Sequence, residues 1–263
     1  MNNSGVLKYC QFVCNKEQVG NSLSPVEFTQ LLQVCNLKHF KKKIGLPEEY
    51  KVGMPLARQT YDLTQKLTED LKQFKVWMGS PDISQLQIDG NGIASLPSDY
   101  YYPSSLSFKH AINSCSEMII KTRMIEVVTD AQWDDVVSHP IKQPTYKYPV
   151  CNFQNTFIRF LPNNLRFVDF IYLRQPKTPV YDYYFGTDGS YIYLPQGINY
   201  TLQAGEQGSN GQTSGVVVSQ TQELEWDDIN KLDIAALILQ HIGINLREGA
   251  LMQYSEKVLN TGT

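Results

Sequence analysis

The chain has 263 residues, with 26 acidic and 23 basic side chains and a formal net charge of -3 at pH 7. Its apolar content of 42% excludes wholesale disorder, and its length predicts one or two domains with a sizeable core. The nearly balanced charge argues against a protein that coats nucleic acid through a basic surface. The longest aliphatic run, residues 234–239, is far shorter than the roughly 20 residues of a membrane-spanning helix, so we expect no membrane partner.

The composition favours contact with other proteins. There are 16 tyrosines and 13 prolines, and the charged fraction is 19%, whereas roughly 25% is usual. Tyrosine is enriched in protein interfaces, while lysine and glutamate are depleted there. A tyrosine-rich β-sheet would give the same count.

The cysteines and the first residues bear on the compartment and on metal binding. Five cysteines at positions 10, 14, 35, 115 and 151 are odd in number and irregularly spaced, which predicts free thiols rather than a disulfide framework. Cys10 and Cys14 fall on one face of a predicted helix, but the sequence offers no CxxC or HxxxH pair to complete a zinc site. We therefore expect no metal and no cofactor. The N-terminus lacks the pattern of a signal peptide, which favours a cytoplasm or a particle assembled there.

Helices are predicted near both ends of the chain. Ser24, Pro25 and Glu27 form a helix start with a capping box, and apolar residues at helical spacing continue this helix to Gly45. A second amphipathic helix is predicted over 56–75. A helix over 223–243 is apolar nearly all round, which indicates a central, buried element that ends at Gly243, and a last helix follows from Asn245.

The middle of the chain, residues 85–222, has frequent turn residues between β-branched and aromatic runs. Two antiparallel hairpins are predicted, 156–161 with 165–173 and 180–185 with 191–194. Residues 104–109 and 118–128 are further predicted strands, and Thr129 with Gln132 predicts a capped short helix. The Gly/Ser/Gln-rich segment 203–215 is expected to be a mobile loop at the tip of a long hairpin.

The predicted fold class is α+β, with a helical bundle formed by the N- and C-terminal helices and an inserted antiparallel β-rich lobe. The predicted parts are residues 1–84 (helical), 85–222 (β-rich) and 223–263 (helices that pack on the first part).

No common catalytic signature is present. The sequence has no P-loop and no G-x-S-x-G motif, and its four histidines stand in separate segments. The pairs Asp134-Asp135 and Asp227-Asp228 each follow a tryptophan at a predicted helix start, where acids cap free N–H groups. We therefore expect no catalytic residue and no enzyme activity. An alternative is a hydrolase built from dispersed residues such as Asp182, Asp188 and His139.

Seven residues are candidates for contacts with partner proteins. The Tyr100–Tyr102 run has no flanking basic residues, which argues against stacking on single-stranded nucleic acid and favours contact with neighbouring protein. The hairpin 156–173 and the loop 203–215 are the other expected contact regions. The seven candidates are Tyr100, Tyr101, Tyr102, Asn163, Asn164, Gly208 and Asn210.

Several stretches, taken together and in order, resemble a known family. They are SPVEFTQLLQVCNLKHFKKKIGLPEEY (24–50), SLPSDYYYPSSL (95–106), HPIKQPTYKYPVC (139–151), FIRFLPNNLRFVDFIYLRQPKTPVYDYY (157–184) and LEWDDINKLDIAALILQHIGINLREGALMQYSE (224–256). The set is similar to the neck-ring and head-to-tail connector proteins of crAss-like tailed bacteriophages and related phages of Bacteroidetes. It carries no catalytic residue.

The resemblance implies a structural role. Such proteins form rings, typically of twelve copies, which are stacked between portal and tail and form part of the DNA ejection channel. The implied partners are further copies of the chain, the portal and other neck or tail ring proteins, with transient passage of double-stranded DNA. The implied location is the virion, assembled in the bacterial cytoplasm. A monomeric tail adaptor or binding module is the alternative from another class.

Overall fold

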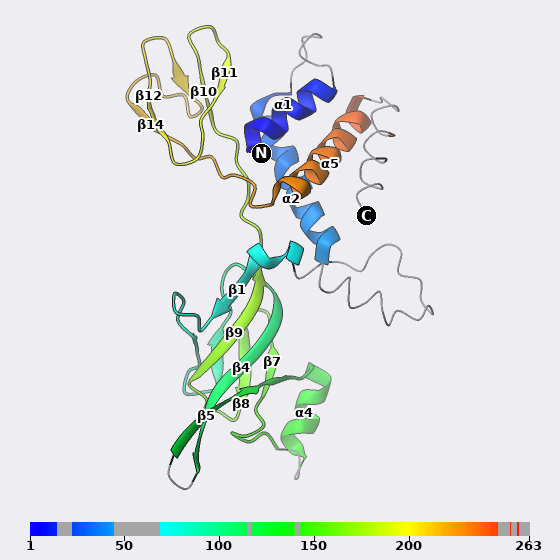
Figure 1. Cartoon of the computed structure of the whole chain (residues 1–263), viewed down its shortest axis with the longest axis vertical. Coiled ribbons are helices and arrows are strands. Elements are labelled where there is room, and N and C mark those ends of the chain that lie inside the picture. The colour runs from blue at the N-terminus through cyan, green and yellow to red at the C-terminus, as the bar shows by residue number, and fades with distance from the viewer. Residues whose placement is uncertain are drawn as a thin grey trace. The chain divides into compact units, whose positions relative to one another are not determined.

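Two helices at the start of the chain and one near its end form the helical part of this mixed α+β protein (Figure 1). The computed structural model describes residues 1–14, 23–44, 69–114, 117–139 and 143–246, together with residues 253 and 257. Helices α1 (Asn3–Val13) and α2 (Pro25–Ile44) pack against α5 (Asp228–Leu246), and the β-sheets are inserted between them in the sequence. The predicted fold class is therefore confirmed. The predicted start of the last helix, at Asn245, falls inside α5, and the rest of that predicted helix lies outside the described residues, apart from positions 253 and 257.

The start of α2 follows the predicted capping box. The Ser24 hydroxyl accepts a hydrogen bond from the Glu27 backbone N–H at 3.3 Å, and Glu27 Oε2 accepts one from the Ser24 backbone N–H at 3.1 Å. These contacts satisfy two N–H groups that the first helical turn leaves unpaired. The predicted helix start is confirmed.

Helix α5 is the buried element that its composition predicts, but its limits differ from those expected. Residues 234–239 are all buried. The helix begins at Asp228 instead of 223, with Asp227 accepting a hydrogen bond from the Asn230 backbone N–H at 3.1 Å. It also continues through Gly243 to Leu246, so the predicted end is wrong. A glycine inside a helix costs only about 1 kcal/mol, which tertiary packing along a buried helix can offset.

The predicted helix over 56–75 lies mostly outside the described residues, and its end is wrong. Residues Lys72–Phe74 form a short 3-10 turn, and Lys75–Met78 form strand β1. Exposure alternates along β1, and Trp77 pairs with Ile171. The β-branched and aromatic residues at 76 and 77 suit this strand better than a helix.

Residues Phe74–Gln175 form one compact unit of two sheets that share a core. One sheet has the order β1-β9-β4-β5, with β2 also paired to β9, and the other has the order β3-β8-β7-β6. Helix α4 (Asp130–Ser138), which starts with the predicted Thr129–Gln132 capping box, packs through Trp133 on Val128 and Val150. The remaining strands of this unit are β2 (Leu86–Gln87), β3 (Ile93–Ser95), β4 (Tyr100–Ser114), β5 (Glu117–Met124), β6 (Glu126–Val127), β7 (Val150–Phe153), β8 (Phe157–Leu161) and β9 (Phe167–Arg174).

Strands β8 and β9 do not form the predicted hairpin. They belong to different sheets, with β8 between β3 and β7 and β9 between β1 and β4. Leu165, in the connection between them, is 1% exposed and belongs to the core that the two sheets enclose. The chain therefore reverses direction at 162–166 by crossing from one sheet to the other.

The second compact unit comprises Met1–Gln73 and Pro176–Thr263, and so joins the helices to a group of short strands. The hairpin of β10 (Tyr183–Phe185) and β11 (Tyr191–Tyr193) is confirmed, as is the long hairpin of β12 (Asn199–Thr201) and β14 (Val216–Val218). These strands belong to the second unit and the sandwich to the first, whereas the sequence analysis predicted that all strands of residues 85–222 form a single lobe. Tyr181, just before β10, packs edge-on against Phe28 of α2, with ring centroids 5.5 Å apart.

Candidate functional site

The tyrosine run at 100–102 divides between core and surface. The Tyr100 ring lies 5.9 Å from that of Phe170 and 6.0 Å from that of Phe153, centroid to centroid. The pKa of the Tyr100 hydroxyl is raised to about 12, mainly by burial and to a smaller extent by the neighbouring Tyr102 and Cys151. Tyr100 is therefore a partly buried residue that packs against the core. Tyr101 is half-buried, and Tyr102, at 58% exposure, is the member of the run that is open to a partner.

The two asparagines of the β8–β9 connection are both exposed, as expected of contact residues. Asn163 packs close to Gly92, where a Cβ atom would lie 2.7 Å from Asn163 Oδ1 and Gly92 itself has a φ of +78°. Asn164 lines a hollow at the end of the sandwich. The turn that carries both residues therefore lies at the surface, where Asn163 contacts Gly92 and Asn164 faces the hollow.

The segment 203–215 is folded into the short-strand region, which differs from the mobile loop predicted. Gln207–Gly208 form strand β13, and Gly208 pairs with Tyr184. Gly208 is buried, and an added Cβ would lie 2.9 Å from Asn210 Oδ1, so this glycine is closed to partners by its own packing. Asn210 is exposed, and its Oδ1 accepts a hydrogen bond from the Gln212 backbone N–H at 3.0 Å.

A buried carboxylate explains why this segment is ordered. Glu206 accepts hydrogen bonds from the Gln203 backbone N–H at 2.7 Å and from the Tyr200 hydroxyl at 3.1 Å. The Tyr200 ring stacks on that of Tyr184 at 4.3 Å. The composition of the segment suggested mobility, but these contacts tie it to Tyr200 and, through the stacked rings, to Tyr184. The candidate residues at 100–102 and 163–164 lie in one compact unit and those at 208 and 210 in the other.

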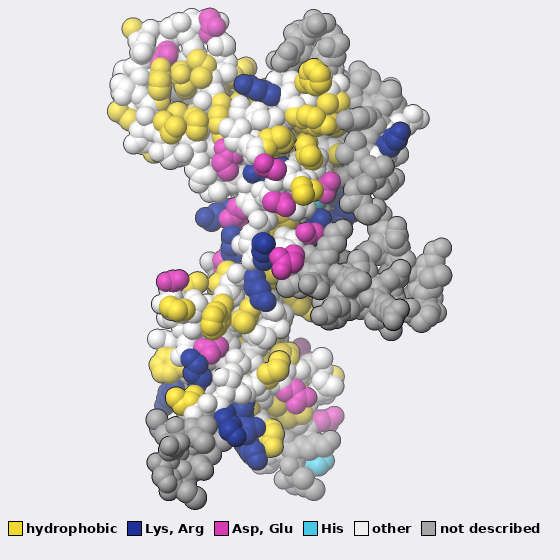
Figure 2. All heavy atoms as spheres, in the orientation of Figure 1, with side chains coloured by type: hydrophobic (Ala, Val, Ile, Leu, Met, Phe, Trp, Pro, Cys, Tyr) yellow, Lys and Arg dark blue, Asp and Glu magenta, His cyan; other side chains and the backbone are white. Residues whose placement is uncertain are grey.

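The two-stranded sheet β12–β14 carries a surface that the sequence analysis missed. On β14, Val216 and Val218 are 53% and 63% exposed, whereas Val217 between them is 5% exposed. Ile198, next to β12, is 48% exposed. Figure 2 shows hydrophobic side chains gathered over this part of the protein. We call Val216 and Val218 the valine surface. The Val-Val-Val run predicts a strand, but only the register with β12 shows which valines face outward.

The outer face of the larger sheet in the sandwich is also partly apolar. Trp77, Phe167 and Met124 are 48%, 54% and 76% exposed. Trp77 pairs with Ile171, and Ser107 pairs with both Met124 and Asp169, so these side chains share the face that points away from the core. Exposed apolar side chains on a sheet face are typical of surfaces that bind other protein.

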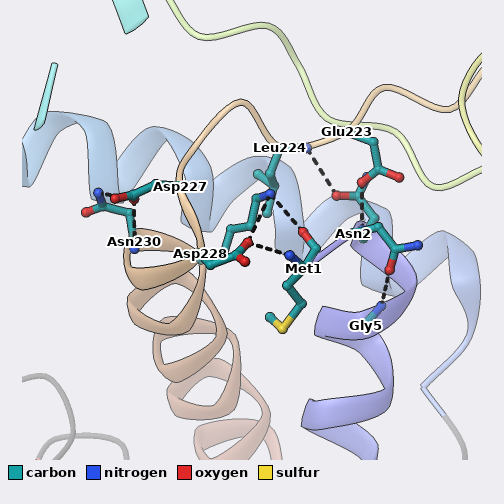
Figure 3. Close-up of polar contacts among 10 residues, drawn as sticks. Met1, Asn2, Gly5, Glu223, Leu224, Asp227, Asp228 and Asn230 are labelled. Carbon is teal, nitrogen blue, oxygen red and sulfur yellow. Dashed lines mark hydrogen bonds and ion pairs between the residues drawn. The ribbon is translucent and has the colours of Figure 1, made fainter. Parts of the chain in front are cut away.

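The N-terminal residues are held by polar contacts to the segment before α5 (Figure 3). The Asn3 amide donates to the carbonyl oxygens of Gln222 at 2.9 Å and Val180 at 3.3 Å, and its Oδ1 accepts from the Leu224 backbone N–H at 3.2 Å. The amino group of Met1 pairs with Asp228. These contacts stabilise the packing of α1 beside α5.

A second polar network lies inside the helical unit. His39 Nε2 lies 3.0 Å from Asn230 Oδ1, and the Trp226 indole N–H donates to Asn36 Oδ1 at 2.7 Å. Burial, the largest cause, lowers the pKa of His39, although the contact with Asn230 opposes this shift. These groups satisfy each other's hydrogen bonds in a buried site, which is typical of a structural network.

The residues considered for a hydrolase have structural partners. Asp182 is 6% exposed and accepts hydrogen bonds from the Ser209 hydroxyl at 2.7 Å and the Gln220 backbone N–H at 2.9 Å. Asp188 lies in the β10–β11 turn, where hydrogen bonds from Ser190 lower its pKa. His139, in the other compact unit, is the C-cap residue of α4. Both carboxylates thus have a structural role, since each accepts hydrogen bonds that stabilise the strand or turn around it.

The paired aspartates have different positions. Asp227 caps α5, as predicted, but Asp134 and Asp135 lie in the middle of α4 and are exposed, so the capping prediction is wrong for that pair. The first turn of α4 instead carries Asp130.

None of the four cysteines within the described residues forms a disulfide, and Cys115 lies outside those residues. Burial raises the pKa of the Cys35 and Cys151 thiols to about 12 and that of Cys10 further. Among the residues that the structure describes, no three His, Cys, Asp or Glu side chains are grouped so as to hold a metal ion. No described helix is long and apolar enough to span a bilayer.

Comparison with known proteins gives no family assignment, since no protein-family model and no curated protein matches the chain.

Proposed function

We propose that the chain is a structural protein of a tailed bacteriophage virion, and that it assembles into a homo-oligomeric ring in the neck or tail, between portal and tail. In such a ring each subunit contacts the next through two different surfaces, and portal or other ring proteins contact the ring from above and below. Double-stranded DNA would pass through the lumen during ejection. The resemblance of five sequence stretches supports this role.

The valine surface is the observation that carries the proposal. Two valines that alternate with a buried residue place apolar area on the open face of a sheet that has only two strands in the described part of the chain. Exposed apolar faces and unpaired strand edges promote association unless another chain covers them. In an obligate oligomer the neighbouring subunit supplies that cover.

Charge reversal on this surface tests the proposal. We expect the wild-type protein to give a mass of several subunits by light scattering after size-exclusion chromatography, and ring-shaped particles in electron micrographs. The double variant Val216→Lys/Val218→Lys should be monomeric with unchanged far-UV circular dichroism, since both side chains already face solvent in the subunit. Val34→Lys is the matched control, because Val34 is 54% exposed but lies on α2.

The outcomes separate this proposal from the monomeric tail adaptor. Assembly of the wild type, its loss in the double variant and its retention in the control support a ring held by the valine surface. A wild-type protein that stays monomeric at every concentration favours the adaptor. Assembly that survives the double substitution would show that other surfaces hold the subunits together.

A further inference from the structure

A hollow of about 240 Å³ opens at the end of the sandwich where β8 connects to β9. Its lining combines cationic, amide and aromatic side chains from four parts of the chain. The lining residues are Gln85, Phe108, Lys109, Tyr146, Asn164, Leu165, Arg166 and Phe167. The proposed ring does not depend on this feature.

We propose that this hollow binds a nucleotide unit, with the base against Tyr146 and Phe167 and the phosphate on Lys109 and Arg166. Ligand sites are concave and are equipped with a few convergent polar groups. Proteins that bind single-stranded nucleic acid combine aromatic rings, on which bases stack, with cations that follow the phosphates. The hollow has both kinds of group within one lining.

The two aromatic side chains of the site, Tyr146 and Phe167, are exposed, and neighbouring rings hold the Tyr146 ring in place. Tyr146 is 37% exposed and Phe167 is 54% exposed. The Tyr146 ring packs edge-on against Phe108 at 5.4 Å and lies 5.0 Å from the His110 ring, centroid to centroid. A ring fixed by its neighbours loses little freedom when a base stacks on it, which favours binding.

The register of the sheet places the cation beside the aromatic ring. Ser107 on β4 pairs with Asp169 on β9 in an antiparallel ladder. Lys109 lies two residues beyond Ser107, and Phe167 lies two residues before Asp169, so the alternation of each strand gives both side chains the same face. Both residues also line the hollow. A phosphate bound by Lys109 would thus lie within one nucleotide of a base that contacts Phe167.

Within the described part of the chain, the cations of the hollow have no acidic partner. Neither Lys109 nor Arg166 forms an ion pair with any residue that the structure describes. Asp169, which contacts the lining residue Gln85, is 6% exposed, and its Oδ1 accepts a hydrogen bond from Gln85 Nε2 at 2.6 Å. That contact also fixes the Gln85 amide, which together with Asn164 offers hydrogen bonds to the edge of a base.

The lining favours a nucleotide over an acidic protein segment because the exposed rings would have no role in binding carboxylates. It also favours a single strand over a duplex, because paired bases cannot enter the hollow. A free nucleotide and a single strand share the chemistry of base and phosphate, and the experiment distinguishes between them.

Fluorescence anisotropy with three probes tests the site: a fluorescein-labelled 20-residue deoxythymidine strand, a labelled 20-base-pair duplex and, as competitor, adenosine monophosphate. We expect the single strand to bind more tightly than the duplex. Two neutralised phosphates predict that its affinity falls about sevenfold between 50 and 200 mM salt. Competition by the monophosphate at comparable concentration would identify a free-nucleotide site, and its failure to compete would identify a strand site.

Variants locate the binding. The double variant Lys109→Glu/Arg166→Glu should abolish the salt-dependent part of the affinity for the single strand. Tyr146→Leu should weaken binding of the strand about tenfold, while Tyr146→Phe should retain it. Lys75→Glu is the control, since Lys75 is exposed on β1 of the same sheet but outside the hollow. The melting temperature of each variant verifies folding. Absence of binding to all three probes at 50 mM salt would overturn the proposal, as would displacement of the strand by polyglutamate at equal charge concentration or an unchanged affinity in the double variant.

Discussion

Replacing Asn3 by alanine should destabilise the second compact unit, which contains α1, α2 and α5. The Asn3 side chain is fully buried and makes three hydrogen bonds, two to carbonyl oxygens and one from the Leu224 N–H. Alanine would leave these three backbone groups without that partner. At about 1 kcal/mol net for each hydrogen bond, the free energy of unfolding should fall by about 3 kcal/mol.

Urea unfolding followed by circular dichroism at 222 nm measures this change, because the long helices belong to the affected unit. Amide hydrogen exchange at Leu224 gives a local readout and should accelerate in the variant. Lys8→Ala is the matched control, since Lys8 is exposed on the same helix and should change stability by less than about 0.5 kcal/mol. A loss in Asn3→Ala no larger than that in the control would refute the role of these contacts.

Three further predictions concern backbone strain, pH and thiols. Gly92→Ala should lower the free energy of unfolding, measured by heat or urea, by about 2 kcal/mol, because the φ of Gly92 is +78° and the added Cβ would lie 2.7 Å from a backbone carbonyl oxygen. Gly90→Ala is the control and should cost far less, since open space surrounds Gly90. Equal losses in the two variants would contradict this reasoning. Because burial lowers the pKa of His39 in the folded protein, the unfolded chain binds a proton more readily than the folded one, so stability should fall as pH drops below about 6.5. His39→Gln should flatten this dependence of stability on pH. An unchanged dependence in the variant would contradict the role of His39. Cys35 should resist iodoacetamide at pH 8 in the folded protein while the more exposed Cys14 reacts, as peptide mass spectrometry would show, and equal labelling would exclude the buried position of Cys35.

Local signals predicted the helices well where capping chemistry is explicit. The Ser24–Glu27 and Thr129–Gln132 pairs mark real helix starts, because a capping box depends only on residues three positions apart. Gly243 failed as a stop signal, since packing around α5 outweighs the cost of one glycine. The fold class therefore followed from local patterns, while element ends depended on tertiary packing.

Strand pairing was the main limit of the sequence analysis. The turn at 162–164 predicts a reversal of the chain, but it does not decide whether the two strands bind each other or enter different sheets. Burial of Leu165 in the shared core places β8 and β9 in separate sheets. No local pattern reports such a contact across a sandwich.

The contact candidates show the same limit. Turn chemistry correctly placed Asn163 and Asn164 at the surface. Tyr100 is instead partly buried and Gly208 buried, in both cases by partners distant in sequence. The valine surface and the hollow were missed because each depends on strand register.

Native mass spectrometry of the purified protein tests the central claim most directly. A subunit of 30.0 kDa in a twelve-membered ring gives a particle of about 360 kDa. The account predicts one dominant closed stoichiometry of this order, which the Val216→Lys/Val218→Lys variant loses while the Val34→Lys variant keeps it. A mass of 30.0 kDa at all concentrations, or an open series of masses without a preferred number of subunits, would contradict the ring.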